Sequence, residues 1–421
     1  MYQAGTTMKT AATLSLISIG LCGISTAEQL LTLFPSSSPA KCTDGSPAGY
    51  YYEPGLQKTK WVVWIEGGGL CQSNADCANR AKSALGSSKY WKQSRIGSQH
   101  QSKDPAQNPD FYDWQHVYLS YCSGDVWVGQ SPEPFNPWAN LDQQDEDSDD
   151  RIFGGRIISA DERRSHSGNA TAGAQEFSFA GHTYLASVID ELKTKYGMVD
   201  ATDVLLTGCS AGGIGTFANT DWLADQFDSS KTKVRGNPMA GYFGLPISTY
   251  AYWSQNKTDP DPTHSATSSW LNNTNPYRGA AVSKCMADSP GADEMVCGAV
   301  PRYYRFTSTP LFVSENTADS YQVYAQGGCP GLDIGYIDYL RDILAGSLRD
   351  QVINGPKNTT DGLFAPACLA HCLAWKGGKA PVVSGVQHQQ AVGDWYYGRG
   401  STHMRINDDP SSKALVSCTD V

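Results

Sequence analysis

The sequence predicts an α/β fold, in which a mostly parallel central sheet is flanked by helices and interrupted by long loop insertions. Short apolar runs typical of buried strands alternate with longer segments of helical apolar spacing, as in βαβ units. The chain has 421 residues, of which 40% are hydrophobic, and shows neither an internal repeat nor a clear linker. We therefore expect residues 28–421 to form a single domain.

The individual elements follow in chain order. Residues 61–65 are rich in Trp and Val, and residues 116–120 form a second apolar run, as expected for strands that are buried on both faces. The expected strands are 61–65, 116–120, 204–207 and 311–314, and the expected helices are 179–193, 212–227 and 337–348.

One segment, residues 130–175, departs from this alternation because it is polar and irregular. Within it, six acidic side chains lie between Asp142 and Asp150. Like charges at this density repel one another unless they are solvated or bind a cation. The segment lacks the spacing and the glycine of a known calcium loop, so we expect a solvated acidic insertion loop and no metal site.

The N-terminal residues indicate the compartment. Lys9 precedes an apolar run at 11–24, which is shorter than the roughly 20 residues that span a bilayer, and small residues follow. This pattern predicts a signal peptide over 1–27 and a secreted protein, possibly one of the cell wall. A secreted chain favours disulfides between its cysteines, and removal of Cys22 would leave an odd number, hence one unpaired thiol. The sequons predict N-glycosylation at Asn169, Asn256, Asn272 and Asn358.

Charge and hydropathy exclude other classes. The net charge is −10 and no basic stripe is present, which argues against nucleic acid as a partner. No segment after the N-terminus is apolar enough to predict a transmembrane helix. We expect a monomer.

The strongest chemical signal is the Gly-x-Ser-x-Gly motif at 208–212, which places Ser210 between an expected strand and an expected helix. A sharp strand-to-helix turn of this kind exposes a Ser hydroxyl for nucleophilic attack, as in α/β-hydrolases. The alternative is a glycine-rich turn around a buried Ser. Residues 66–69 follow another strand and supply glycine N–H groups, so we expect an oxyanion hole formed by the backbone N–H groups of Gly68, Gly69 and Ala211.

A Ser nucleophile needs a base and an acid later in the chain. The strand at 311–314 is followed by Glu315 and Asp319, either of which could be the acid. The order of the motifs allows His371, His388 or His403 as the base, and the residues alone leave that choice open.

Several longer motifs resemble the pectin acetylesterase family, which also contains the carboxylesterase Notum. The resemblance runs through the mature chain and includes the following segments: 42–51, 64–69, 108–112, 121–127, 208–213, 317–320, 367–372 and 391–396. It implies an α/β-hydrolase-like fold without a cofactor or a metal. It also implies Ser210 as the nucleophile, Asp319 as the acid and His371 as the base, with Glu315, His388 and His403 outside the triad.

Further residues are interpreted within this resemblance. Leu70, Tyr242 and Phe243 are candidates to line an acyl pocket, and Leu70 stands where the family tends to carry an aromatic residue. We expect disulfides Cys71–Cys77 and Cys42–Cys122. We assign the unpaired thiol to Cys209, because its neighbour Ser210 leaves little room for a partner.

The function that follows is that of a secreted serine carboxylesterase. We expect it to remove ester-linked acyl groups, acetate above all, from a cell-wall polysaccharide or another O-acylated substrate. One alternative is a Notum-like esterase that acts on a lipidated protein, which a deep apolar pocket beside Ser210 would favour. A non-catalytic, secreted glycan-binding protein is a more distant alternative.

Overall fold

A computed structural model of the protein describes residues 1, 28–138, 151–153, 156–158, 175–245, 247–257, 274–292, 294–372, 381–400 and 403–406. Within these ranges the central sheet contains ten strands in the order β16-β13-β12-β11-β10-β3-β5-β2-β1-β4. The seven neighbouring strands β16, β13, β12, β11, β10, β3 and β5 run parallel to one another. At the β5 edge, β2, β1 and β4 extend the sheet, and each is antiparallel to the strand before it. The bounds are β1 Glu28–Leu33, β2 Gly49–Glu53, β3 Gln57–Ile65, β4 Ser94–Ile96, β5 Trp114–Leu119, β10 Asp203–Cys209, β11 Lys233–Met239, β12 Phe312–Ser314, β13 Gly362–Ala365 and β16 Met404–Ile406.

Among the described residues, three short antiparallel pairs of strands lie outside this sheet. They are β6 Ser131–Phe135 with β9 Phe177–Phe179, β7 Arg151–Phe153 with β8 Arg156–Ile158, and β14 Val382–Val383 with β15 Val386–Gln387.

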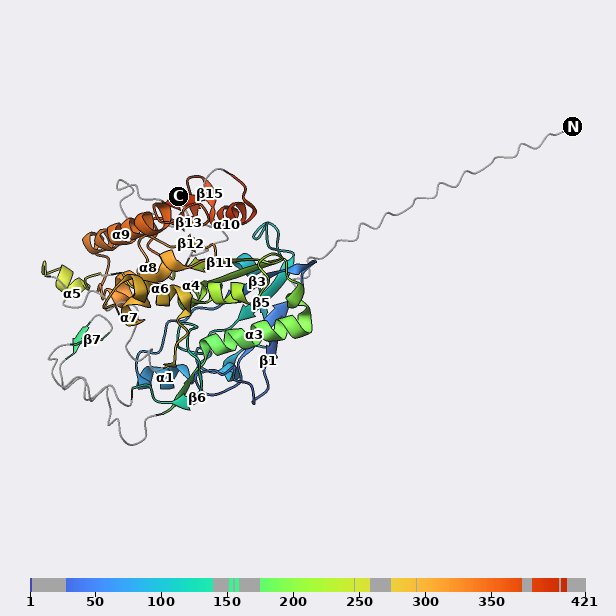
Figure 1. The fold of residues 1–421 in the computed structure, drawn as a ribbon, viewed down its shortest axis with the longest axis horizontal. Helices are drawn as coiled ribbons and strands as arrows, with labels where there is room; N and C mark the ends of the chain where they lie inside the picture. The colour runs from blue at the N-terminus through green and yellow to red at the C-terminus, as the bar shows by residue number, and fades with distance from the viewer. Residues whose placement is uncertain are drawn as a thin grey trace.

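The helices are found in the segments that connect the strands, and they flank the sheet (Figure 1). The α-helices are α1 Asn74–Arg80, α3 Gly181–Tyr196, α4 Ala211–Asp225, α5 Tyr250–Trp253, α6 Gly279–Asp288, α7 Glu294–Cys297, α8 Val300–Tyr303, α9 Ile334–Leu348 and α10 His388–Tyr397. The 3₁₀ turns are Ser88–Tyr90, Gln99–Gln101, Met198–Asp200 and Tyr304–Phe306, and the π-helical turns are Gln322–Gln326 and Arg349–Ile353.

Successive side chains of the central strands point to opposite faces of the sheet. On β3, Trp61 and Val63 belong to a core that includes the apolar face of α3, whereas Val62 and Trp64 belong to a second core that includes α10. A third core lies under α6, α8 and α9 at the other end of the sheet. Figure 1 shows α3 and α4 (green) near β3 and β5, and the late helices α9 and α10 near β13. Both faces of the parallel strands are therefore covered.

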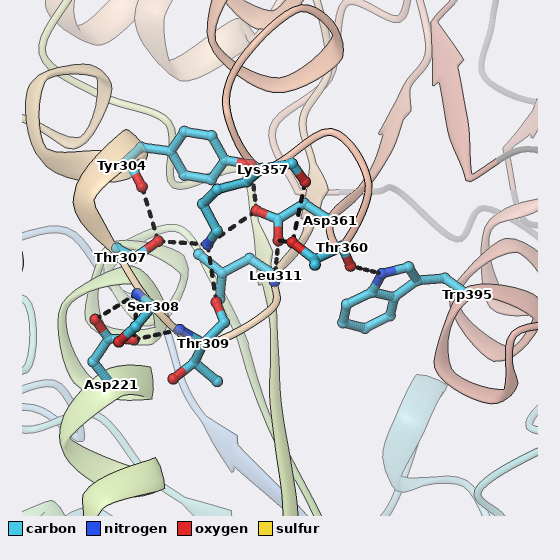
Figure 2. Close-up of polar contacts among 10 residues, drawn as sticks. All are labelled: Asp221, Tyr304, Thr307, Ser308, Thr309, Leu311, Lys357, Thr360, Asp361 and Trp395. Atoms are coloured by element: carbon cyan, nitrogen blue, oxygen red, sulfur yellow. Dashed lines mark hydrogen bonds and ion pairs between the residues drawn. The ribbon is translucent and has the colours of Figure 1, made fainter.

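A buried polar network fixes the start of two neighbouring strands (Figure 2). The carboxylate of Asp361 accepts a hydrogen bond from the backbone N–H of Leu311 at 3.2 Å, and lies 3.1 Å from the ammonium of Lys357. Lys357 also donates to Thr307 Oγ1 and to the carbonyl of Thr309, at 2.7 and 2.9 Å. These contacts join the segment before β12 to the segment before β13.

The structure confirms the predicted fold class and each of the strands and helices expected from the sequence, with boundaries that shift by a few residues. Three strands are found where a polar, irregular loop was expected over 130–175, namely β6, β7 and β8. At β6, Phe135 packs on Phe179 of β9 with ring centroids 5.7 Å apart, so an apolar contact overrides the polar composition. The acidic run from Asp142 to Asp150 and the expected signal peptide lie outside the described residues.

Candidate active site

Ser210 occupies the turn between β10 and α4, where its backbone has φ 61° and ψ −123°. A residue other than glycine rarely adopts positive φ, and such strain is common at functional sites. The flanking glycines make the turn possible, because a Cβ on Gly208 or Gly212 would lie 2.3 or 2.1 Å from the carbonyl oxygen of Ile65. The Ser210 side chain is thus held at the carboxyl end of the parallel strands.

The glycine loop after β3 passes directly over this turn. A Cβ on Gly67 would lie 2.9 Å from the Cβ of Ser210. Gly69 has φ 73°, which favours glycine, and the Gly68 carbonyl accepts a hydrogen bond from Arg80 Nη1 at 2.7 Å. Among the described residues, no acceptor is recorded for the N–H groups of Gly68, Gly69 and Ala211. These donors remain available to a ligand beside Ser210.

Asp319 and His371 meet on the loops that follow β12 and β13. His371 Nδ1 lies 2.7 Å from Asp319 Oδ2, and Asp319 Oδ1 accepts from the N–H of Gln322 at 3.0 Å. The Asp319 carboxylate is completely buried, whereas the imidazole is 20% exposed. Since Nδ1–H donates to the carboxylate, the ring presents the lone pair of Nε2, which has no hydrogen-bond partner among the described residues.

Two aromatic rings enclose the imidazole of His371. The ring centroid of Tyr321 lies 5.2 Å away and that of Phe243 lies 6.2 Å away. Together they cover part of the imidazole surface, which stays 20% exposed.

A cavity of about 670 Å³, which includes its open mouth, lies along α4 on the same side as Phe243. Its lining is largely apolar, with Ile214, Phe217 and Phe243 among its walls and with Asp221 and Arg278 as charged members. Ile214 is one helical turn from Ser210, whose carbonyl accepts its N–H at 2.9 Å. The cavity therefore adjoins the segment that carries Ser210.

The predicted pocket residues do not all reach this cavity. Phe243 lines it. Tyr242 is buried behind the site, where its backbone N–H donates to Glu315 Oε2 at 2.9 Å and its hydroxyl contacts Ser347. Leu70 packs against the core under α3. Tyr242 and Leu70 are accordingly not among the residues that line the cavity.

The assignment of Cys209 as the unpaired thiol is wrong, because Cys209 forms a disulfide with Cys372. Cys209 ends β10 and its side chain points to the α10 face of the sheet, in the core with Met239. The side chain of the next residue, Ser210, points in a different direction, so it does not block a disulfide partner of Cys209. Within the described part of the chain, the free cysteine is the buried Cys329.

The two expected disulfides are present, with Cys71 joined to Cys77 and Cys42 joined to Cys122. A further disulfide joins Cys285 to Cys297. The Cys71–Cys77 bond closes the segment directly after Gly69 and connects it to α1.

The two other candidate bases lie apart from the Asp319–His371 pair, whereas the other candidate acid, Glu315, lies near Asp319. His388 Nε2 is 2.8 Å from Ser314 Oγ, in a fully buried cluster with His100. His403 precedes β16, the neighbour of β13, and its carbonyl accepts the N–H of Leu363 at 2.8 Å, at the start of β13 and away from the loop that carries His371. The Glu315 side chain is buried, and this burial together with the nearby Asp319 raises its pKa well above the ordinary value.

The remaining surface predictions are only partly covered by the structure. Of the sequons, Asn256 and Asn358 are exposed, whereas Asn169 and Asn272 lie outside the described residues. Glycosylation stays a prediction at all four. Within the ranges given above, no cluster of three or more His, Cys, Asp or Glu side chains is placed to hold a metal ion. In the same ranges, none of the helices combines the length and hydropathy that a membrane crossing requires.

Two residues that contact the site, Arg80 and Tyr321, were not identified from the sequence. Arg80 holds the glycine loop through Gly68 and is itself held by Asp76, whose Oδ2 lies 3.0 Å from its Nε. Tyr321 packs on His371. Only the spacing of Tyr321 two residues after Asp319 could have drawn attention to it.

Comparison with known proteins adds independent information. The family model described as pectinacetylesterase matches residues 25–144 and 158–414. Pectin acetylesterase 7 of Arabidopsis thaliana is 27% identical over 431 residues, and the alignment covers 96% of each chain. Pectin acetylesterase 5 of the same plant is 26% identical, and the alignment covers 86% of this chain and 78% of that protein. The palmitoleoyl-protein carboxylesterase NOTUM of Mus musculus is 27% identical, covering 78% of this chain and 58% of its own. With a strand–elbow–helix around Ser210 and a family match over most of its length, the chain belongs to the pectinacetylesterase family.

Proposed function

We propose that this protein is a serine carboxylesterase whose triad is Ser210, His371 and Asp319. The observation that carries the proposal is the 2.7 Å contact between His371 Nδ1 and Asp319 Oδ2, which leaves Nε2 without a partner. Family membership supports an ester hydrolase. No hydrogen bond between Ser210 and His371 is recorded, and such contacts are often loose before substrate binds.

In the proposed acylation step, Ser210 Oγ attacks the ester carbonyl while His371 Nε2 takes the hydroxyl proton. The Asp319 carboxylate keeps Nδ1 protonated and stabilises the imidazolium that forms. The negative charge on the former carbonyl oxygen is stabilised by the N–H groups of Gly68, Gly69 and Ala211. The imidazolium then protonates the leaving alcohol, and the acyl group remains on Ser210.

In the deacylation step, water replaces the alcohol. His371 Nε2 takes a proton from the water, whose oxygen attacks the acyl carbonyl and forms a second tetrahedral oxyanion. Collapse of this oxyanion returns the proton to Ser210 Oγ and releases the carboxylic acid. The same donors and the same base thus serve both halves of the reaction.

As substrate we propose a secreted polysaccharide that carries short O-acyl groups, acetate above all. The similar Arabidopsis proteins are named pectin acetylesterases, and the disulfides among the described residues fit an oxidising, extracellular environment. A net charge of −10 repels a polyanion at long range, which favours a glycan with few charges.

A longer acyl group is the second candidate, and the apolar cavity along α4 favours it. Phe243 contacts the His371 ring on one side and lines the cavity on the other, so an acyl chain on Ser210 has an apolar space nearby. The similar NOTUM proteins are named palmitoleoyl-protein carboxylesterases.

The test is hydrolysis of p-nitrophenyl esters from acetate to octanoate by the wild type and by Ser210→Ala. We expect Ser210→Ala to lower kcat by about 10⁴-fold or more, because no other group can carry the acyl intermediate. Ser187→Ala on α3 is the control, since that hydroxyl bonds only within its own helix and its loss should leave kcat unchanged. Activity retained in Ser210→Ala would refute the mechanism, and a clear preference for octanoate would replace the short-chain substrate by the longer one.

A further inference from the structure

The proposed triad is assembled from two halves that belong to different parts of the chain. Asp319 and His371 lie on neighbouring loops that are held firmly to each other. The carbonyl of Ala370 accepts hydrogen bonds from Asn316 Nδ2 at 2.9 Å and from the N–H of Ser320 at 3.3 Å, in addition to the contact between His371 and Asp319. The position of His371 relative to its acid is therefore over-determined.

The position of His371 relative to the nucleophile depends on different contacts. The hydrogen bonds that the structure records for 366–372 run to residues 316–320, on the acid side. The link to the elbow is instead covalent, because Cys209 and Cys372 form a disulfide with their Cα atoms 5.8 Å apart. Each of these cysteines adjoins a triad member, Ser210 or His371.

The backbone on both sides of this disulfide adopts an unfavourable conformation. Ser210 has φ 61° and Cys372 has φ 54°, both in the left-handed region that residues with a Cβ rarely occupy. Such conformations persist where the surroundings impose them, and they cluster at sites where geometry matters for chemistry. The disulfide joins these two strained segments directly.

We propose that the Cys209–Cys372 disulfide is a positioning element of the triad, which sets the distance between Ser210 Oγ and His371 Nε2. The inference rests on the proposed function, in which these two atoms exchange the proton. A disulfide with a purely structural role would contribute to the stability of the fold and leave turnover by folded molecules unchanged. A positioning role instead makes kcat depend on the bond.

The test compares two double variants, Cys209→Ala/Cys372→Ala and Cys285→Ala/Cys297→Ala, as purified full-length proteins. The second pair removes a disulfide between α6 and α7, so it controls for the loss of a cross-link as such. For each variant, circular dichroism establishes the folded fraction, and kcat and KM are measured with p-nitrophenyl acetate across pH 5 to 9.

We expect the Cys209/Cys372 double variant to lose kcat on the order of 10- to 100-fold with KM changed less than about threefold, because small misplacements of reacting groups have effects of this size. The pH profile of kcat/KM should shift on its acidic limb, which reports the base of the free enzyme. The single variants Cys209→Ala and Cys372→Ala should match the double variant, since the pair acts as a unit. The control should keep its kcat and its profile.

If the double variant does not fold, limited reduction of the wild type with dithiothreitol replaces it. The dithiol is oxidised to its cyclic disulfide as the protein disulfide gains two electrons and two protons. Cys372 is only partly buried, whereas Cys42 and Cys122 are fully buried, so we expect alkylation of Cys209 and Cys372 to rise in step with the loss of activity.

Unchanged kcat in the folded double variant, or in wild type alkylated at these two cysteines, would overturn the inference, as would an equal loss in the control. If Ser210→Ala is inactive in the same assay, such a result removes only the positioning role and leaves the proposed function intact.

Discussion

At the scale of single residues, Gly69 is the position where the backbone most directly limits the chemistry. Its φ of 73° suits glycine alone, and an added Cβ would lie 3.1 Å from Arg80 Nη2. We predict that Gly69→Ala lowers kcat by up to about 10²- to 10³-fold with a smaller change in KM, because the proposed oxyanion donors of this loop would be displaced. Steady-state kinetics with p-nitrophenyl acetate measures both constants.

Gly197 provides the matched control for this prediction. It has nearly the same φ, 77°, at the end of α3, and a Cβ there would meet nothing within 4 Å. Gly197→Ala therefore adds the same backbone strain at a distance from Ser210, and we expect it to reduce thermal stability and leave kcat unchanged. Equal kinetic losses in both variants would show that Gly69 has no particular role.

The residue scale also shows where inference from sequence succeeds and where it fails. Ser210 and the glycines around it were identifiable because a sharp turn requires particular residue types at fixed spacing. The pairing of Cys209 with Cys372 was missed because side-chain direction depends on the strand that carries the cysteine, and 163 residues separate the partners. Arg80 and Tyr321 meet the site only through the folding of loops, which no local pattern encodes.

At the scale of elements, the buried network of Figure 2 sets how β12 and β13 enter the sheet. The Asp361 side chain is fully buried, and burial raises its pKa while Lys357 opposes that rise. We predict that Lys357→Met lowers the free energy of unfolding by about 3 to 5 kcal/mol, because it leaves a buried carboxylate without its cation. Urea-induced unfolding at pH 7 measures the change.

Lys82→Met serves as the reference for that experiment. Lys82 is exposed and has no recorded ion pair within the described part of the chain, so its replacement should change the unfolding free energy by less than about 0.5 kcal/mol. A similarly small effect at Lys357 would mean that the hydrogen bonds from Tyr304, Thr360 and Leu311 satisfy the Asp361 carboxylate without Lys357.

The burial and composition of the strands explain which of them could be predicted from the sequence. The strands β3, β5 and β10 each contain a short apolar run, because both of their faces are covered. The strand β11 is equally central, yet it carries Gly236, Asn237 and Pro238. Asn237 is buried and donates to the carbonyl of Phe312 at 2.7 Å, so a tertiary hydrogen bond compensates for a composition that disfavours strands.

At the scale of the whole molecule, three imidazoles outside the proposed triad link stability to pH. His100, His116 and His388 are all buried, and burial lowers the pKa of His100 to about 4 and that of His116 to about 3. Burial and the neighbouring His100 also lower the pKa of His388 well below its ordinary value. In the unfolded chain these imidazoles have a pKa near 6.5, so below that pH the unfolded state binds protons that the folded state does not. The free energy of unfolding is therefore unaffected by these groups above pH 6.5 and falls as the pH drops toward 4.

We predict that His388→Gln makes stability less dependent on pH between 6.5 and 4. Each buried imidazole contributes up to about 1.4 kcal/mol per pH unit to the slope, and the variant removes one of them. Because buried carboxyls such as Glu315 titrate with the opposite sign, the informative quantity is the difference between variant and wild type. Urea unfolding at several pH values gives this difference, and parallel curves for the two proteins would contradict the prediction.

The two cysteines of the Cys209–Cys372 disulfide are synthesised at different times. Residue 372 is synthesised 163 residues after residue 209, which at 5–20 residues per second takes roughly 10 to 30 s. During that interval Cys285 and Cys297 emerge as well, but these two are only 12 residues apart, and a short loop closes faster than a long one. The native partner of Cys209, the cysteine beside the proposed nucleophile Ser210, is therefore absent until the segment that carries His371 has been made.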